Sequence, residues 1–302
     1  MLLVLPIVLL CFLLLPESAS AWGGGIHLQT GLNVLASLDT LPPQLAAILA
    51  VHPRDYLYDC IAADITIGKK YTHYLLNCHR WGVGQKVLDA AATDGEQACA
   101  WGYLSHLAAD VIAHNYYVPY KIVRSFSTVT MKHTYWEMRF ETFADRSVWD
   151  RAREICRSDQ ERNDLLLRRV LTPTIFSFGT NKRIFNSILL LSRLEKWQQV
   201  MQTLSENSRY TLADSDRDEY LRLAETAVFD LLRNHRESCF WKADPTGERA
   251  LAAADALRKN LRFLYRSGRM SRESGMEQVE GIKGRLLEAI HRPELLKGLH
   301  SV

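Results

Sequence analysis

A histidine, an aspartate and a second histidine recur at four-residue intervals in the segment WGYLSHLAADVIAHNYYVPY. They are His106, Asp110 and His114. Residues four apart lie on one face of an α-helix, so this spacing predicts a helix on which the three side chains converge. Imidazole and carboxylate groups on one face are typical ligands of a divalent metal ion. The feature therefore requires a helical fold that carries a metal site.

A second pair of ligand types follows in the segment KHTYWEMRF, where Glu137 lies four residues after His133. Two such pairs on two helical segments indicate more than one metal ion. A hydrogen-bonded cluster of core histidines is the alternative interpretation. A di-iron bundle would need Glu-x-x-His pairs, and a c-type haem would need Cys-x-x-Cys-His, so the histidine-rich set favours zinc.

The remainder of the chain also has a helical period and no strand-like alternation. Asp94 is expected to cap the first metal helix and Pro119 to end it, while Pro245 suits the first turn of a later helix. The 302 residues predict an all-α protein with one large domain over 22–244 and a C-terminal helical extension over 245–302. Helices are expected over 26–37, 44–51, 94–118, 128–157, 183–201, 214–234, 245–266 and 275–290.

The N-terminus is almost wholly apolar over residues 2–15, which is too short to span a bilayer comfortably. The small residues Ala19, Ser20 and Ala21 follow and form a cleavage signature, so residues 1–21 predict a signal peptide and an exported protein. The leader has no Lys or Arg, and retention as an anchor is the alternative. Cleavage would leave five of the six cysteines, an odd number whose pairing the spacing does not assign.

Cleavage after Ala21 would make Trp22 the first residue, with a free α-amino group. A deprotonated N-terminal amine and its backbone carbonyl can chelate a metal ion. The three glycines that follow let the chain fold back tightly, which brings His27 towards the same region. Asp64 and His79 are two further candidate ligands, but their spacing does not place them on one helix face. His73 is the alternative to His79 as the ligand from this segment.

Taken in order, these residues resemble the ligand set of the zinc-dependent phospholipase C superfamily. This superfamily includes bacterial phospholipases C, glycosylphosphatidylinositol-specific phospholipase D and, more distantly, single-strand-specific nucleases. The resemblance covers residues 22–140 and implies an all-α, phospholipase C-like domain with up to three zinc ions in a cleft. The matching positions are Trp22, His27, Asp64, His79, His106, Asp110, His114, His133 and Glu137.

The resemblance also implies how the ligands are shared between the ions. The step from Asp110 to His114 is four residues, as in the phospholipase D-like branch, whereas it is six in secreted phospholipases C and the nucleases. Asp110 would bridge the first and third ions. The first ion would be held by Asp64, His79, His106 and Asp110, the second by His114, His133 and Glu137, and the third by Trp22 and His27.

The activity implied by the resemblance is hydrolysis of a phosphodiester by a metal-activated water, with Asp64 as the catalytic proton acceptor. The expected substrate is a phospholipid or a lipid-linked headgroup, with peripheral membrane contact. The net charge of +3 is too small to indicate binding of duplex nucleic acid, and the oligomeric state stays open. A single-strand nuclease or nucleotidase and a non-catalytic zinc-binding protein are the alternatives. Candidates for a substrate-facing rim, with a core role expected for most, are Tyr116, Tyr117, Tyr120, Phe126, Tyr135 and Trp136.

Overall fold

The computed structural model describes residues 23–66, 77–128, 133–171, 177–192, 203 and 214–301. Within these ranges the chain forms helices and no strand, which confirms the all-α prediction. In chain order the α-helices are α2 (Gly24–Leu35), α3 (Pro43–Val51), α4 (Pro53–Ala62), α5 (Trp81–Ala90), α6 (Asp94–Ile112), α7 (Val118–Arg124), α8 (His133–Glu141), α9 (Arg146–Arg157), α10 (Glu161–Val170), α11 (Phe178–Ser192), α13 (Asp214–Asn234), α14 (Glu248–Arg266) and α15 (Arg272–His291).

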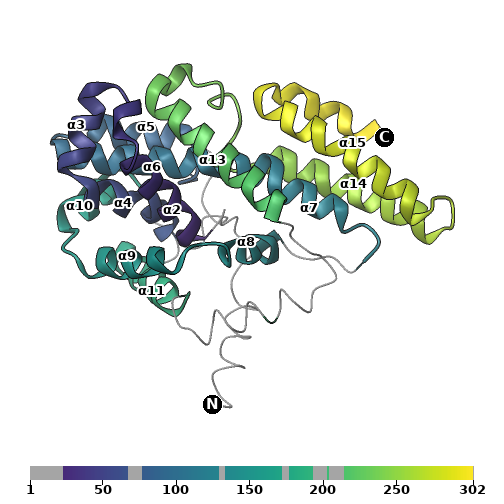
Figure 1. The fold of residues 1–302 in the computed structure, drawn as a ribbon, viewed down its shortest axis with the longest axis horizontal. Helices are drawn as coiled ribbons and strands as arrows, with labels where there is room; N and C mark the ends of the chain where they lie inside the picture. The colour runs from purple at the N-terminus through teal and green to yellow at the C-terminus, as the bar shows by residue number, and fades with distance from the viewer. Residues whose placement is uncertain are drawn as a thin grey trace, which may run out of the picture.

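Helix α6 lies inside the helical body and packs against α4, α13 and α5 (Figure 1). From Ala98 to Ile112 its side chains are buried on nearly every face, with Trp101 half-buried. A helix buried all round is a core element. Because this helix also carries His106 and Asp110, two ionisable groups lie in the interior, where they need compensating partners.

The N-terminus of α6 is capped by Thr93 and not by Asp94 as the sequence predicted. The Thr93 hydroxyl accepts a hydrogen bond from the Glu96 backbone N–H at 3.3 Å, and the Glu96 carboxylate accepts one from the Thr93 N–H at 3.2 Å. This reciprocal pair is a capping box, which satisfies two backbone donors at the same time. Asp94 therefore becomes the first helical residue, where its charge still favours the positive end of the helix dipole.

The predicted helix end at Pro119 is wrong, because the chain stays helical through that residue. Helix α6 passes into a π-helical turn, η5 (Ala113–Tyr117), and α7 begins directly after it. Pro119 lies in the first turn of α7, where a missing backbone N–H is tolerated. The π-helical turn widens the helix and changes the direction of the residues that it contains.

Other predicted helices also have different bounds, and the helix expected from residue 183 already begins at Phe178. The helix expected over 128–157 is two helices, α8 and α9, separated by residues 142–145. Pro245 lies before α14 and not in its first turn, because Gly247 occupies the N-cap position with a left-handed φ of 60°. The turn that precedes α14 is therefore set by a glycine.

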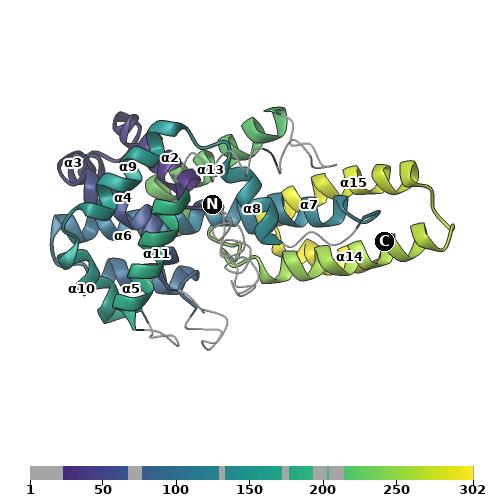
Figure 2. The same cartoon turned by 90° about the horizontal axis from the view of Figure 1, so that it is seen from below.

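The C-terminal helices α14 and α15 run side by side and extend to one side of the molecule (Figures 1 and 2). They pack against α7 and the π-helical turn η5. Tyr120 of α7 donates a hydrogen bond to Glu280 of α15 at 2.7 Å, and the buried Lys121 donates to Asp216 of α13 at 2.7 Å. The first of these contacts connects the predicted extension to the helix that follows His114, and the second connects that helix to α13.

The described helices include none that is both long and apolar enough to cross a membrane. The predicted signal peptide and Trp22 lie outside the described residues, and the domain bounds stay predictions. In the part of the chain that the structure describes, no disulfide joins the cysteines, which are Cys60, Cys78, Cys99, Cys156 and Cys239.

Gly102 tests the close approach of α4 to α6. A Cβ atom at this position would overlap the Tyr56 carbonyl oxygen, which belongs to the α4 backbone and cannot rotate away. We expect Gly102→Ala to lower the free energy of unfolding by about 1–3 kcal/mol, as for overpacked cores. Thermal or denaturant unfolding measures the change.

Gly284 of α15 is the matched control, because it is also helical but no atom lies within 4 Å of its added Cβ. Gly284→Ala should raise stability by up to about 1 kcal/mol through helix propensity alone. Equal effects of the two substitutions would contradict the close packing of α4 on α6.

Candidate metal centre

Two histidines face each other at the centre of the candidate site. His79 lies just before α5 and His106 lies on α6, and their Nε2 atoms are 3.1 Å apart. Asp64, on the short helix η2 (Ala63–Ile65) after α4, places Oδ1 3.1 Å from His79 Nε2. Asp110 places Oδ2 3.3 Å from both imidazole Nε2 atoms. The structure thus brings together the four residues expected around the first metal ion.

Asp110 also faces a third imidazole with its other oxygen. Its Oδ1 atom lies 3.2 Å from Nε2 of His27, which α2 brings to the site. The His27 ring stacks on the His106 ring, with centroids 3.8 Å apart. Groups of possible ligand atoms therefore form on both sides of the carboxylate, one with His27 and His106 and one with Asp64, His79 and His106. This is the arrangement that a bridging carboxylate requires.

His114 does not join this cluster, although the four-residue spacing predicted convergence with His106 and Asp110. It lies in the π-helical turn η5, whose wider backbone spacing breaks the α-helical register. Its Nε2 atom instead lies 3.5 Å from Glu137 Oε1 of α8. Both side chains are buried, so they form a second pair of ligand types beside the main cluster.

In His106 and His114, the Nδ1 atom of the ring is hydrogen-bonded to a backbone carbonyl oxygen. His106 Nδ1 lies 2.9 Å from the Cys60 carbonyl oxygen, and His114 Nδ1 lies 2.7 Å from the Pro245 carbonyl oxygen. Since a carbonyl only accepts, each Nδ1 carries the proton and donates. In the neutral ring the Nε2 lone pair is then left for a metal ion, as in most histidine ligands.

The residues fit zinc by two tests that do not depend on the family resemblance. Both ring nitrogens of His27 and both carboxylate oxygens of Asp110 are buried without a hydrogen bond of acceptable geometry, which is costly unless another group compensates them. Two ligands of a tetrahedral zinc ion at 2.0–2.1 Å are roughly 3.3 Å apart. The ligand atoms of the cluster that face one another are 3.1–3.3 Å apart, which matches this separation.

The pKa shifts of Asp110 and His27 favour the charge states that metal binding requires, whereas the shift of His106 favours its protonated form. Burial lowers the pKa of His27, and the neighbouring His106 adds to the effect. Burial also disfavours the charged form of His106, but the carboxylates of Asp110 and Asp64 outweigh it and raise the pKa. For Asp110, burial is outweighed by His106 and His27, which hold its pKa well below the usual range. Asp110 is therefore ionised and His27 neutral, as ligands must be.

Three predicted positions are not described in the same detail. Trp22 and the competing candidate His73 lie outside the described residues. His133 begins α8, but its side chain is outside the description. The ligand roles of these three residues stay predictions. The geometry of the site is that of the other candidate ligands.

Glu141 supports the site but was missed in the sequence. Its carboxylate accepts hydrogen bonds from the backbone N–H groups of Gly25 at 3.1 Å and Ile26 at 3.0 Å, at the start of the helix that carries His27. Burial raises the pKa of Glu141 to about 7, with the backbone donors acting in the opposite direction. An added Cβ at Gly23 would lie 2.5 Å from the Glu141 carboxylate carbon. The only feature of the sequence that could have indicated Glu141 is its position four residues after Glu137, on the same helix face.

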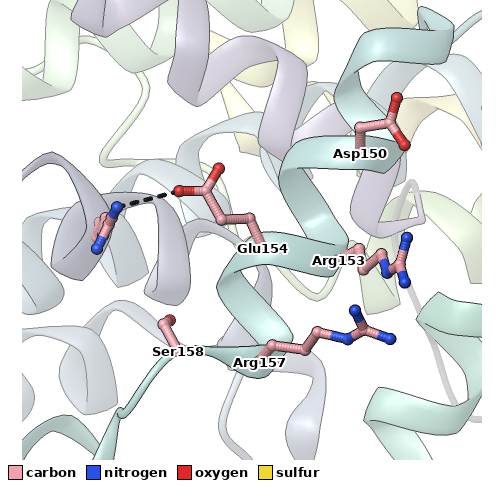
Figure 3. A pocket seen from close by; sticks show the side chains of 6 residues that line it. Asp150, Arg153, Glu154, Arg157 and Ser158 are labelled. Carbon is pink, nitrogen blue, oxygen red and sulfur yellow. Dashed lines mark hydrogen bonds and ion pairs between the residues drawn. The ribbon is translucent and has the colours of Figure 1, made fainter.

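A surface pocket on α9 is separate from this centre (Figure 3). Its carboxylate Glu154 is paired with Arg54 at 3.2 Å and with Arg151 at 2.6 Å. The pocket contains none of the predicted metal ligands, and its Glu154 is ion-paired at an exposed surface, where such pairs contribute little. We therefore assign the chemistry to the buried cluster. The residues that line the pocket are Arg54, Asp150, Arg153, Glu154, Arg157 and Ser158.

Comparison with known proteins agrees with the geometry of the buried cluster. No curated protein and no solved structure matches the chain. Residues 26–173, however, match the family described as zinc dependent phospholipase C, and this range includes every candidate ligand from His27 to Glu137. Through these residues the chain belongs to the zinc-dependent phospholipase C family, whose members are phosphoric diester hydrolases.

Proposed function

We propose that this protein is an exported phosphodiesterase that binds up to three zinc ions and hydrolyses phospholipids or lipid-linked phosphodiesters. The observation that carries the proposal is the buried carboxylate of Asp110, whose two oxygens face His27 on one side and His79 and His106 on the other. Such a group is suited to bridge two metal ions. Clustered candidate zinc ligands and a phosphodiester hydrolase family together support this reaction type.

The proposed ligand set combines geometry with resemblance. Contacts of the described residues support His27, Asp64, His79, His106 and Asp110 around two ions, and the pairing of His114 with Glu137 around another. The amine of Trp22 and the ring of His133 complete the set by resemblance alone. Glu141 supports the role of Trp22, because it fixes the start of α2 close to the expected N-terminus.

Asp64 is the proposed proton acceptor in the reaction. Bound zinc supplies Lewis-acid polarisation of the phosphoryl group and lowers the pKa of the attacking water. The side chain of Asp64 is 13% exposed, whereas those of His79 and Asp110 are 2% and 0% exposed, so Asp64 marks the side from which water and substrate arrive. The water oxygen bonds to phosphorus, the bond from phosphorus to the leaving alcohol breaks, and the alcohol oxygen gains a proton.

The lipid assignment is supported by the four-residue step from Asp110 to His114, which matches the phospholipase D-like branch. The aromatic rim candidates do not favour either substrate, because the same side chains could have contacted a lipid or stacked on nucleobases and most of them are buried in the core. Of the six rim candidates, only Tyr135 is half-buried. The others are fully buried core residues, namely Tyr116, Tyr117, Tyr120, Phe126 and Trp136.

The substrate test compares zinc-loaded protein on phosphatidylcholine vesicles and on single-stranded DNA. We expect hydrolysis of the lipid and no cleavage of DNA. Diacylglycerol with phosphocholine would mean cleavage on the glycerol side of phosphorus, and phosphatidic acid with choline would mean cleavage on the headgroup side. Cleavage of DNA alone would favour the nuclease alternative, and inactivity on both would favour a non-catalytic zinc protein.

His79→Ala tests the cluster directly. Removal of this imidazole deletes a ligand that faces three others, so we expect at least one zinc ion fewer per protein. Loss of metal assistance is worth several kcal/mol, so activity should fall by roughly 100-fold or more. Elemental analysis and initial rates measure the two effects. His291→Ala is the control, because His291 is exposed and outside the cluster, and an equal loss in both variants would refute the assignment.

Asp64→Asn separates proton transfer from metal binding. Asparagine keeps a neutral oxygen ligand but removes the base, and a positioned general base contributes roughly 100- to 10,000-fold in rate. We expect zinc content close to that of the wild type and kcat reduced by at least roughly 100-fold. Unchanged kcat at full zinc content would show that another group accepts the proton.

A further inference from the structure

The turn before α14, residues 243–247, reaches back to the metal centre although it lies far along the chain and beyond the family match. Residues 243 and 245–247 are buried, and residue 244 is half-buried. The family match ends at residue 173, so this turn is an element of the chain that the match does not include. We call it the 243–247 turn. It contacts both segments of the centre that carry His79 and His114.

The contact with His114 is a hydrogen bond to the ring. The Pro245 carbonyl oxygen accepts from His114 Nδ1 at 2.7 Å, and the neighbouring Asp244 carbonyl oxygen accepts from the Asn115 side-chain amide at 2.8 Å. The first bond sets the tautomer and the rotation of the imidazole, so that Nε2 faces Glu137. The second bond, from Asn115 to Asp244, holds the residue that follows His114 in the π-helical turn.

Gly247 brings the backbone of the turn against His114 itself. Its φ is 60°, which favours glycine, and an added Cβ would overlap both the Cβ and the carbonyl oxygen of His114. Neither atom is the far end of a flexible side chain. A side chain at position 247 would therefore displace His114 or the turn, and the hydrogen bond from Nδ1 to Pro245 would lengthen in either case.

The contact with the His79 segment runs through the two residues that follow it. Trp81 Nε1 donates to the Ala243 carbonyl oxygen at 2.8 Å, and its ring stacks on Trp241 with centroids 4.6 Å apart. The Arg80 guanidinium lies 3.6 Å from the Asp244 carboxylate and 3.5 Å from that of Glu248. The same turn is thereby tied to the backbone next to His79.

We propose that the 243–247 turn is a positioning element of the metal centre, with Gly247 as its positioning residue for His114. The turn fixes the direction of the His114 ring. It also contacts the segment that carries His79, so it holds these two ligands at a fixed distance from each other. The inference rests on the proposed role of His114 as a zinc ligand. It also gives the C-terminal region a functional part, because Gly247 is the N-cap residue of α14.

Gly247→Ala in the full-length protein tests the inference, with Gly268→Ala as the matched control. Gly268 has a similar φ of 71°, but no atom lies within 4 Å of its added Cβ. Zinc affinity is measured by competition with a chromophoric chelator, and folding by circular dichroism of the metal-free protein. We expect Gly247→Ala to weaken zinc binding by roughly 10- to 100-fold, as for other groups that orient metal ligands. Gly268→Ala should leave the zinc affinity unchanged.

The double variant with His114→Ala shows whether the effect passes through His114. Contacting residues that act as a unit are not additive, so Gly247→Ala should have a clearly smaller effect on zinc affinity once the imidazole is absent, because only the tie to the His79 segment then remains. Equal weakening in both backgrounds would overturn the inference, as would a folded Gly247→Ala protein with wild-type affinity. Wild-type affinity in His114→Ala alone would overturn the ligand assignment, and the inference with it.

A milder variant decides the question if Gly247→Ala does not fold. Trp81→Phe removes the indole N–H that donates to Ala243 and keeps an aromatic ring against Trp241. The loss of one buried hydrogen bond to the turn should weaken zinc binding by roughly fivefold. An unchanged zinc affinity in this variant would overturn the inference.

Discussion

The buried carboxylate of Asp110 is the group on which the rest of the structure depends. It lies in the last turn of the buried helix α6, fully removed from water, and neither oxygen has a hydrogen bond of good geometry. An ionised carboxylate in this position is very costly unless opposite charge compensates it. Three imidazole rings within 3.3 Å and the metal ions they would hold supply that compensation. Packing of α2, α4 and α6 therefore serves the core and the metal centre at once.

Backbone carbonyls from two distant parts of the chain set the direction of the ligands. The Cys60 carbonyl on α4 holds His106, and the Pro245 carbonyl before α14 holds His114. The first lies within the residues that match the family and the second lies outside them. The metal centre is thus completed by a region whose sequence contains no metal ligand of its own, and the C-terminal helices stabilise it by packing against α7 and η5.

The sequence predicted which residues the structure brings together better than it predicted the directions of their side chains. The α-helical spacing of His106 and Asp110 was sufficient, because both lie in a regular helix. His114 was expected on the same face, but the π-helical turn that redirects it has no signature in residue type or spacing. Pro245 could not be found, because it acts through a carbonyl that every residue has. Glu141 carried only the weak signal of a carboxylate four residues beyond another.

The most direct test of the account is the number of zinc ions per protein, by elemental analysis of exported protein whose N-terminus has been sequenced. A trinuclear site with the N-terminal amine as a ligand requires close to three ions and Trp22 as the first residue. One ion or none after metal repletion would contradict the account, because the buried carboxylate of Asp110 would then bridge nothing. Two ions with an uncleaved N-terminus would retain the cluster around His79 and His106 and exclude Trp22 from it.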